Sequence, residues 1–80
     1  MARVLLFGAL RDLAGWRERI FEEGSDLTSL RSDIARLHPD LAEALNGPGV
    51  QVAVDKALVR GNVTLSAASE VAFLPPMSGG

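Results

Sequence analysis

The sequence predicts a small two-layer α+β domain, in which one main helix covers one face of a mixed sheet of four to five strands. The 80 residues suit a single domain, and 48% of them are hydrophobic, which is enough to build one core. Short runs rich in β-branched and aromatic residues stand near the start, the middle and the end of the chain, and one stretch between them has helical periodicity. Because one amphipathic helix covers only one sheet face, the other face is expected to stay open to solvent or to a partner.

The first half of the chain is expected to form two strands and the main helix. Residues 3–7 are a β-rich run that ends at Gly8, residues 16–22 are a second extended run, and good helix formers at residues 9–14 predict about one helical turn between them. Asp26 stands where a helix N-cap is expected, since its carboxylate can accept hydrogen bonds from amides two or three residues later. The apolar face of this helix is expected to consist of Leu27, Leu30, Ile34, Leu37 and Leu41.

The second half is expected to add a short helix and the remaining strands. Pro39 biases His38 away from the α region, so the main helix should end there and a short second helix should run from Pro39 to Leu45. The final strand should end at two prolines, which cannot donate sheet hydrogen bonds. The other predicted elements are strands at residues 50–54, 57–60 and 70–74 and a turn at Asp55 and Lys56.

Alternation along the first and last strands separates core residues from surface residues. The core set, expected to face the helix, is Val4, Leu6, Val71 and Phe73. The open set, expected on the other face, is Leu5, Phe7, Ala72 and Leu74. Because the open set is apolar and lies beside the end of the chain, it predicts a docking surface for a partner; a covering loop is the alternative.

The sequence ends in a diproline, two further residues and two glycines, at residues 75–80, which predicts that the reactive group is the C-terminal carboxylate. Glycine has no Cβ, so two glycines in a row let the backbone enter a narrow channel in another protein. An extended chain of this length reaches about 20 Å, and the diproline holds its base in a polyproline-like direction. An ordinary frayed terminus is the alternative interpretation.

The composition argues against several classes of function. With a formal net charge of -2 and a pI near 5.2, the chain offers no basic surface for nucleic acid or for an anionic membrane. It has no cysteine, so it can form neither disulfides nor thiolate metal sites. No stretch approaches the length of a membrane span or has the pattern of a signal peptide, which predicts a cytoplasmic protein.

The side chains predict no catalytic site within the chain. His38, the only histidine, lies at a helix end before Pro39, which favours a capping or solvated role. Ser78 is the only hydroxyl near the chain end, and the sequence shows no base that would activate it. Neither a metal-ligand spacing nor a phosphate-binding glycine loop is present. Any acids, bases and metals of a reaction are therefore expected to come from partners.

Three segments resemble the small, sulfur-carrier subunit of molybdopterin synthase, and together they span the chain. They are residues 4–15 (VLLFGALRDLAG), 52–59 (VAVDKALV) and 70–80 (EVAFLPPMSGG), of which the last is the most specific. The sequence departs from the family pattern at Asp55, where asparagine is common, and at residues 67–69, which replace an Asp-Gly turn. The resemblance implies a ubiquitin-like β-grasp fold, with a domain at residues 1–74 and an extended, flexible tail at residues 75–80.

The resemblance also implies a reaction at Gly80. A ubiquitin-activating-type adenylyltransferase would use ATP to form an acyl-adenylate at the carboxylate, and a sulfur-donor sulfurtransferase would convert it to a thiocarboxylate. The large synthase subunit would take up the tail in a heterotetramer, where the sulfur passes to cyclic pyranopterin monophosphate. The chain would then be the sulfur-donating half of an enzyme of molybdenum cofactor biosynthesis and would bind no cofactor or metal itself.

The residues expected to serve this reaction fall into two groups. The residues that thread into the large subunit ahead of Gly80 are Pro75, Pro76, Met77, Ser78 and Gly79. The residues of the body that contact the large subunit are Phe7, Leu58 and Leu74.

Three other functions remain open from the sequence. A thiamin-pathway sulfur carrier would share the fold and the Gly-Gly end, although the Phe-x-Pro-Pro pattern at residues 73–76 favours the molybdopterin branch. A ubiquitin-like protein modifier would use the same activation and be joined to lysines through Gly80. A plain interaction module with an inert tail would not be adenylated by an activating enzyme.

Overall fold

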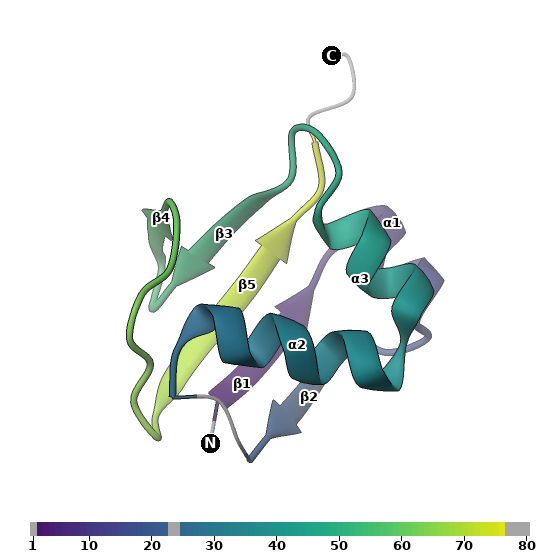
Figure 1. Ribbon diagram of the computed structural model, residues 1–80. Helices are drawn as coiled ribbons and strands as arrows, with labels where there is room; N and C mark the ends of the chain where they lie inside the picture. Colours follow the sequence, from purple (N-terminus) through teal and green to yellow (C-terminus); the bar gives the residue numbers. More distant parts are fainter. Residues whose placement is uncertain (1, 23–24, 77–80) are drawn as a thin grey trace.

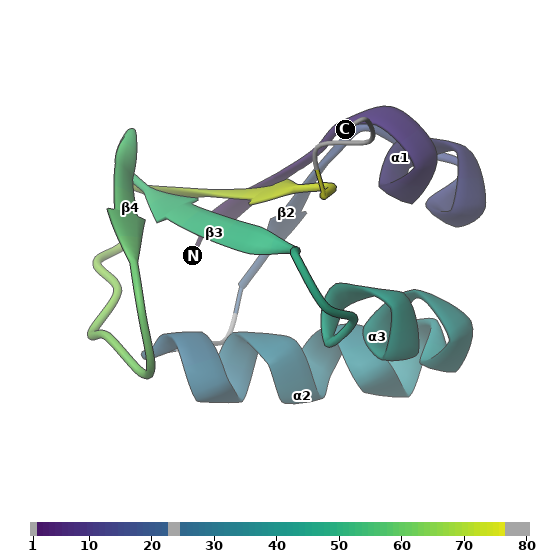
Figure 2. The same ribbon diagram turned by 90° about the horizontal axis from the view of Figure 1, so that it is seen from above.

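The protein folds into a five-stranded mixed sheet with helices packed against one face (Figure 1). The structure, a computed structural model, describes residues 2–22 and 25–76. Figure 2 shows α2 and α3 together on one side of the sheet and α1 beyond its end, so the predicted two-layer α+β class is confirmed. The elements are β1 (Ala2–Leu6), α1 (Gly8–Ala14), β2 (Glu18–Phe21), α2 (Leu27–Leu37), α3 (Pro39–Leu45), β3 (Gln51–Val54), β4 (Ala57–Val59) and β5 (Ser69–Leu74).

The first and last strands of the sequence lie side by side in the sheet. The strand order is β2-β1-β5-β3-β4, and β1 pairs in parallel with β5, whereas the other pairs are antiparallel. The register places Leu6 opposite Phe73 and Gln51 opposite Leu74. The end of β5 is therefore flanked by the end of β1 on one side and by the start of β3 on the other.

The core lies between the sheet and helices α2 and α3. The predicted core set is confirmed, because each of its four residues is at most 2% exposed. Helix α3 shares the cover with α2, so the helical layer is larger than the one main helix expected. Burial of one such side chain stabilises the fold by roughly 1.5–3 kcal/mol, so this face of the sheet provides much of the stability. The largest fully buried side chains are Phe73, Leu30, Ile34, Leu41, Val4 and Val71.

Two residues predicted at helix ends are caps in the structure. At the start of α2, Asp26 Oδ1 accepts a hydrogen bond from the Ser29 amide at 2.8 Å. Hydrogen bonds from Ser29 and from the Asn62 side chain lower the pKa of Asp26 below its ordinary value. His38 Nδ1 accepts from the Leu41 amide at 3.2 Å and so caps the start of α3. Both helices therefore begin where the sequence predicts.

The turn between β3 and β4 lies at the predicted position, Asp55 and Lys56. Both residues have positive φ angles, 50° and 72°, as the central residues of a two-residue type I′ hairpin turn do. Asp55 Oδ1 accepts a hydrogen bond from the Glu70 amide at 2.9 Å, and the Asp55 amide donates to the Glu70 carbonyl at 2.8 Å. These bonds fix the turn to the start of β5.

Candidate functional site

The described part of the predicted reactive end is the base of the tail. Pro75 and Pro76 follow β5 directly, and Pro75 is half-buried while Pro76 is exposed. Sheet pairing ends at Leu74, because proline has no backbone N–H to donate. The other predicted tail residues lie outside the described residues; they are Met77, Ser78, Gly79 and Gly80.

The tail base lies between two glycines that come from different parts of the chain. Pro75 lies beside Gly8, the first residue of α1, and Pro76 lies beside Gly49, in the loop between α3 and β3. The strands β1 and β3 are the two neighbours of β5 in the sheet. The chain therefore leaves the domain between the start of α1 and the loop that precedes β3.

The open face of the sheet carries a row of apolar residues across four strands. Leu5 on β1 pairs with Ala72 on β5, and Ala72 pairs with Ala53 on β3. Ala53 in turn pairs with Leu58 on β4. Directly paired residues point to the same face of a sheet, so these four side chains form one continuous row. The row is therefore continuous in the sheet, and Leu58, Leu5 and Ala72 are its accessible members, since Ala53 is only 8% exposed.

The structure places the three predicted interface residues on or beside this row. Leu58 ends the row at the edge strand and is 62% exposed, and Phe7, directly after β1, is 45% exposed. Leu74 ends β5 next to Pro75 and is half-buried. Phe7 and Leu74 lie at the end of the sheet from which the tail leaves, whereas Leu58 lies level with Ala72, two residues before the end of β5.

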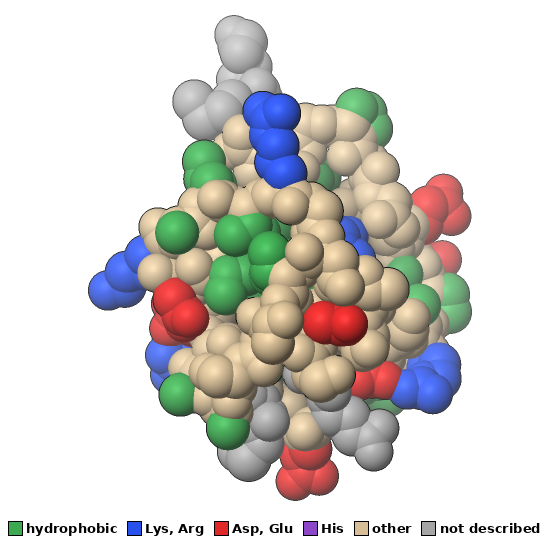
Figure 3. Space-filling view, turned by 60° about the vertical axis from the view of Figure 1, so that its left-hand side comes forward, with side chains coloured by type: hydrophobic (Ala, Val, Ile, Leu, Met, Phe, Trp, Pro, Cys, Tyr) green, Lys and Arg blue, Asp and Glu red, His purple; other side chains and the backbone are tan. Residues whose placement is uncertain are grey.

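A groove of about 450 Å³ runs beside β4, lined by residues of α2, β3 and β4. Figure 3 shows hydrophobic side chains gathered on this side of the molecule, with a positively charged side chain close by. Within the groove, the Arg31 guanidinium lies 5.2 Å from the centre of the Phe73 ring and donates to Asn46 Oδ1 at 3.1 Å. Burial lowers the pKa of Arg31. The described lining contains no carboxylate, histidine or hydroxyl group, so it offers no acid or base.

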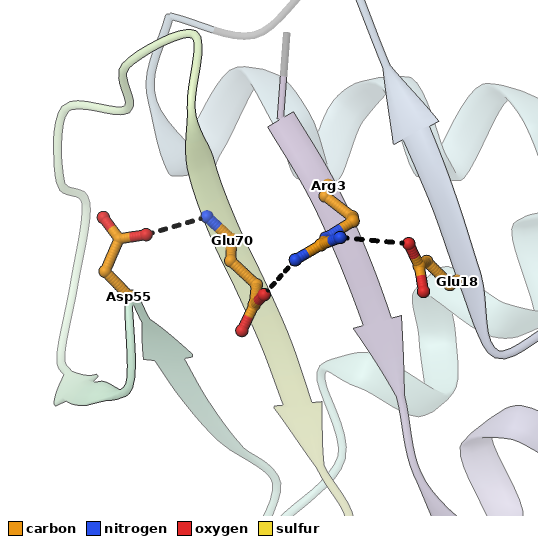
Figure 4. A network of polar contacts seen from close by, with 4 residues as sticks. All are labelled: Arg3, Glu18, Asp55 and Glu70. Carbon is orange, nitrogen blue, oxygen red and sulfur yellow. Dashed lines mark hydrogen bonds and ion pairs between the residues drawn. The ribbon is translucent and has the colours of Figure 1, made fainter.

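The opposite end of the open face is charged. Arg3 on β1 forms an ion pair with Glu70 on β5 and another, at 3.4 Å, with Glu18 on β2, which is itself paired with Leu5 in the sheet (Figure 4). The hydrogen bond to Glu70 and the charge of Glu18 raise the pKa of the Arg3 guanidinium. Surface pairs of this kind contribute little to stability. On the open face, the apolar row and not this charged end is therefore the part that suits a hydrophobic partner.

In residues 2–22 and 25–76, no group of three or more His, Cys, Asp or Glu side chains could hold a metal ion. None of the helices in this part of the chain is long and apolar enough to cross a membrane. What the described residues do provide is an apolar surface beside the base of the tail.

Comparison with known proteins gives the family and the fold. The model of the ThiS family matches residues 4–80. None of the curated proteins matches by sequence. Small archaeal modifier protein 1 from Methanosarcina acetivorans is 22% identical, with 99% of this chain and 95% of that chain covered and a TM-score of 0.86. A candidate molybdopterin converting factor, subunit 1, from Pyrococcus furiosus is 27% identical, with 95% and 97% covered and a TM-score of 0.77.

A third solved structure, CysO from Mycobacterium tuberculosis, is 20% identical, with 96% of this chain and 100% of that chain covered and a TM-score of 0.79. At such low identity the likeness shows a shared fold, whereas the family match rests on the sequence itself and reaches residue 80. The protein thus belongs to the ThiS family, and its fold is the ubiquitin-like β-grasp fold expected from the sequence.

Proposed function

We propose that this protein is a sulfur carrier of molybdenum cofactor biosynthesis, the small subunit of molybdopterin synthase, and that Gly80 carries the sulfur. The observation that carries the proposal is the diproline and Gly-Gly end of a ThiS-family chain, which follows the central strand β5 directly. The Phe-x-Pro-Pro pattern at residues 73–76 supports the molybdopterin branch over the thiamin branch. The likeness to the Pyrococcus furiosus protein supports the same branch.

The chemistry of Gly80 requires an activating partner. Its α-carboxyl group has a reference pKa of about 3.3–3.7, so it is ionised at neutral pH and is a poor electrophile. A ubiquitin-activating-type adenylyltransferase transfers AMP from ATP to the carboxylate and releases pyrophosphate, which leaves an acyl-adenylate. A sulfur-donor sulfurtransferase then supplies the sulfur, AMP leaves, and a thiocarboxylate remains. ATP and any metal ion enter with the activating partner.

The large synthase subunit completes the enzyme. It takes the tail into its active site and supplies the catalytic side chains, while this chain supplies the sulfur atom and its position. Two carriers deliver the two dithiolene sulfurs to cyclic pyranopterin monophosphate in a heterotetramer. Positioning alone is a large contribution, because well-oriented groups react with effective concentrations of roughly 10⁵–10⁸ M.

The apolar row and its neighbours form the proposed surface for the large subunit. Phe7 and Leu58 are the exposed large side chains on this part of the sheet, and Leu74 joins them at the tail base. Apolar anchors that lose all contact with water on binding carry most of the energy of an interface. A surface beside the tail also lets one partner hold the body and the chain end together.

A second candidate function is protein modification through Gly80. The fold likeness to small archaeal modifier protein 1, with a TM-score of 0.86, favours this candidate. Activation would be the same, but a lysine amine would displace AMP and form an isopeptide bond. Isopeptide-linked conjugates in cells that express the protein with an N-terminal affinity tag would support modification. Their absence, with sulfur present at Gly80, would support the carrier alone.

The decisive experiment is the intact mass of the protein from cells and after incubation with its activating enzyme, ATP and a sulfur donor. The proposal expects a mass increase equal to the difference between a sulfur atom and an oxygen atom. Fragmentation should place the change on Gly80. A chain from which Gly80 has been deleted is the control, and it should keep its calculated mass. An unchanged native mass under conditions that load an established carrier would contradict the proposal.

A further inference from the structure

Two glycines with left-handed backbone angles are also in close contact with the prolines of the tail base. Gly8 has a φ angle of +56°, and a Cβ at this position would lie 3.1 Å from Pro75 Cγ. Gly49 has a φ angle of +83°, and a Cβ there would lie 2.7 Å from Pro76 Cβ and 3.5 Å from Pro76 Cα. The 3.1 Å distance at Gly8 is tight, and the 2.7 Å distance at Gly49 is shorter than real Cβ contacts allow. The prolines therefore occupy the space that side chains at these two positions would need.

Two other glycines of the same chain provide the contrast. Gly15 and Gly61 have φ angles of +82° and +72°, close to that of Gly49, but a Cβ on either would meet nothing within 4 Å. Their left-handed backbone is sufficient reason for glycine. Close approach by another part of the chain is an additional feature of Gly8 and Gly49, and in both cases the approaching residue is a proline of the tail base.

The sheet topology makes these contacts two-sided. Gly8 follows β1 and Gly49 precedes β3, and these strands are the two neighbours of β5. Proline fixes its own φ near −65° and restricts the residue before it, so the diproline has few free torsions. With one glycine against each proline ring, the chain has little freedom to swing toward either side as it leaves the domain.

We propose that Gly8 and Gly49 are positioning residues that clamp the diproline and set the direction in which the tail leaves the domain. A tail already pointed toward a partner's channel loses less conformational freedom on entry than a freely swinging one. The clamp itself rests on the contacts above, and its effect on sulfur loading rests on the proposed function.

Spin-label distances test the clamp without reference to sulfur. The chain has no cysteine, so Ser32→Cys, at an exposed position of α2, and Ser78→Cys give one labelled pair. Electron–electron distances are compared in three backgrounds: unchanged, Gly49→Ala and Gly15→Ala. The two alanine variants have the same left-handed strain, and only Gly49→Ala meets the tail. We expect the distance distribution to shift or broaden in Gly49→Ala and to stay unchanged in Gly15→Ala.

Two results would overturn the clamp. One is an unchanged distance distribution in folded Gly49→Ala, and the other is an equal change in Gly15→Ala. If Gly49→Ala fails to fold, Gly8→Ala, with the milder contact to Pro75, replaces it and should give a smaller change in the same direction. An unchanged distribution in that variant would count equally against the clamp.

Loading kinetics then test the effect on the reaction. With the activating enzyme, Gly49→Ala should lower kcat for adenylation, by up to about a hundredfold, at unchanged KM, because the body still docks while the carboxylate is misplaced by about 1 Å. Gly15→Ala should behave as the native chain does. Altered distances with native kinetics would refute the positioning role. If the native chain itself is never adenylated, the proposed function fails while the distance result still decides the clamp.

Discussion

The two faces of the sheet differ sharply although the same strands build both. On β1 and β5 the core residues that face the helices are 0–2% exposed, whereas Leu5, Ala72 and Leu74, which alternate with them, remain partly exposed. The covered face is apolar, while the open face changes from charged at Arg3 to apolar at Leu5. Stability and recognition thus depend on alternating residues, so moving a mutation by one position should change which property is lost.

The largest effect is expected beyond both faces, at the chain end. Deleting Gly80, or adding one residue after it, moves the reacting carboxylate by about 3.5 Å, and a misplacement of 1 Å can already cost about a hundredfold in rate. Sulfur transfer should be abolished while circular dichroism and Tm stay unchanged. Product formation with the cognate partners is the measurement. Normal transfer by either variant would show that function is not concentrated at the end of the chain.

The next effect concerns the covered face. Phe73→Ala should cost roughly 3–5 kcal/mol, and Ile34→Ala roughly 2–5 kcal/mol, because each leaves a cavity in the core. A domain of this size has a total stability of only about 4–12 kcal/mol, so both variants should be largely unfolded on mild heating. Leu5→Ala, on the open face, is the control and should change Tm little. Equal losses for Leu5→Ala and Phe73→Ala would contradict the division between the faces.

The fold was largely predictable because local patterns determine most of its elements. The cap at Asp26, the capping histidine before α3 and the turn at Asp55 are set by neighbours within a few residues, and each lies where the sequence places it. The parallel pairing of β1 with β5 joins the two ends of the domain. Alternation shows which side chains share a face but not which strands pair. The pairing of β1 with β5 could therefore be expected only from the β-grasp fold that the family resemblance implied.

The candidate site was predictable only in part. The Gly-Gly end and the apolar open set can be read from the sequence, since each is contiguous or alternates along a strand. The contact of Gly49 with Pro76 could not be predicted from the sequence, because glycine is common in any turn between a helix and a strand. The contribution of Ala53 was missed for a related reason, as its place in the apolar row depends on cross-strand register.

A moderate effect is expected at the open face, the proposed surface for the large subunit. Leu58→Glu and Phe7→Glu should each weaken binding to the large synthase subunit about tenfold or more, because they place a charge where an apolar anchor is desolvated. Leu37→Glu is the matched control. The prediction that Leu37 belongs to the apolar face of the main helix was wrong, because at the last position of α2 its side chain is 57% exposed. Titration calorimetry measures the affinity, and thermal melts check folding. Equal weakening by Leu37→Glu would place the interface elsewhere.

A smaller effect is expected at the start of α2, which belongs to the covering layer. Hydrogen bonds to Asp26 lower its pKa in the folded state, so the cap adds stability above the ordinary aspartate pKa, about 3.9, and this stability is lost as the pH falls through the lowered value. Asp26→Ala should therefore lower Tm at neutral pH, and the difference from the native chain should shrink in acid. Asp12→Ala controls for loss of a negative charge. A Tm difference that does not depend on pH would contradict the role of the charged cap.

The smallest effect is expected at the turn between β3 and β4, away from the apolar row. Lys56 has a φ angle of 72°, a strained value for a residue with a Cβ, and Asp-Gly suits a type I′ turn better. Lys56→Gly should therefore raise the free energy of unfolding by a few tenths to about 1 kcal/mol, since glycine also gains freedom in the unfolded chain. Asp55→Gly relieves similar strain but removes the acceptor for the Glu70 amide, so it should not stabilise the fold. Denaturant titrations measure the free energy of unfolding of both variants. A lower value for Lys56→Gly, or a higher one for Asp55→Gly, would contradict this account of the turn.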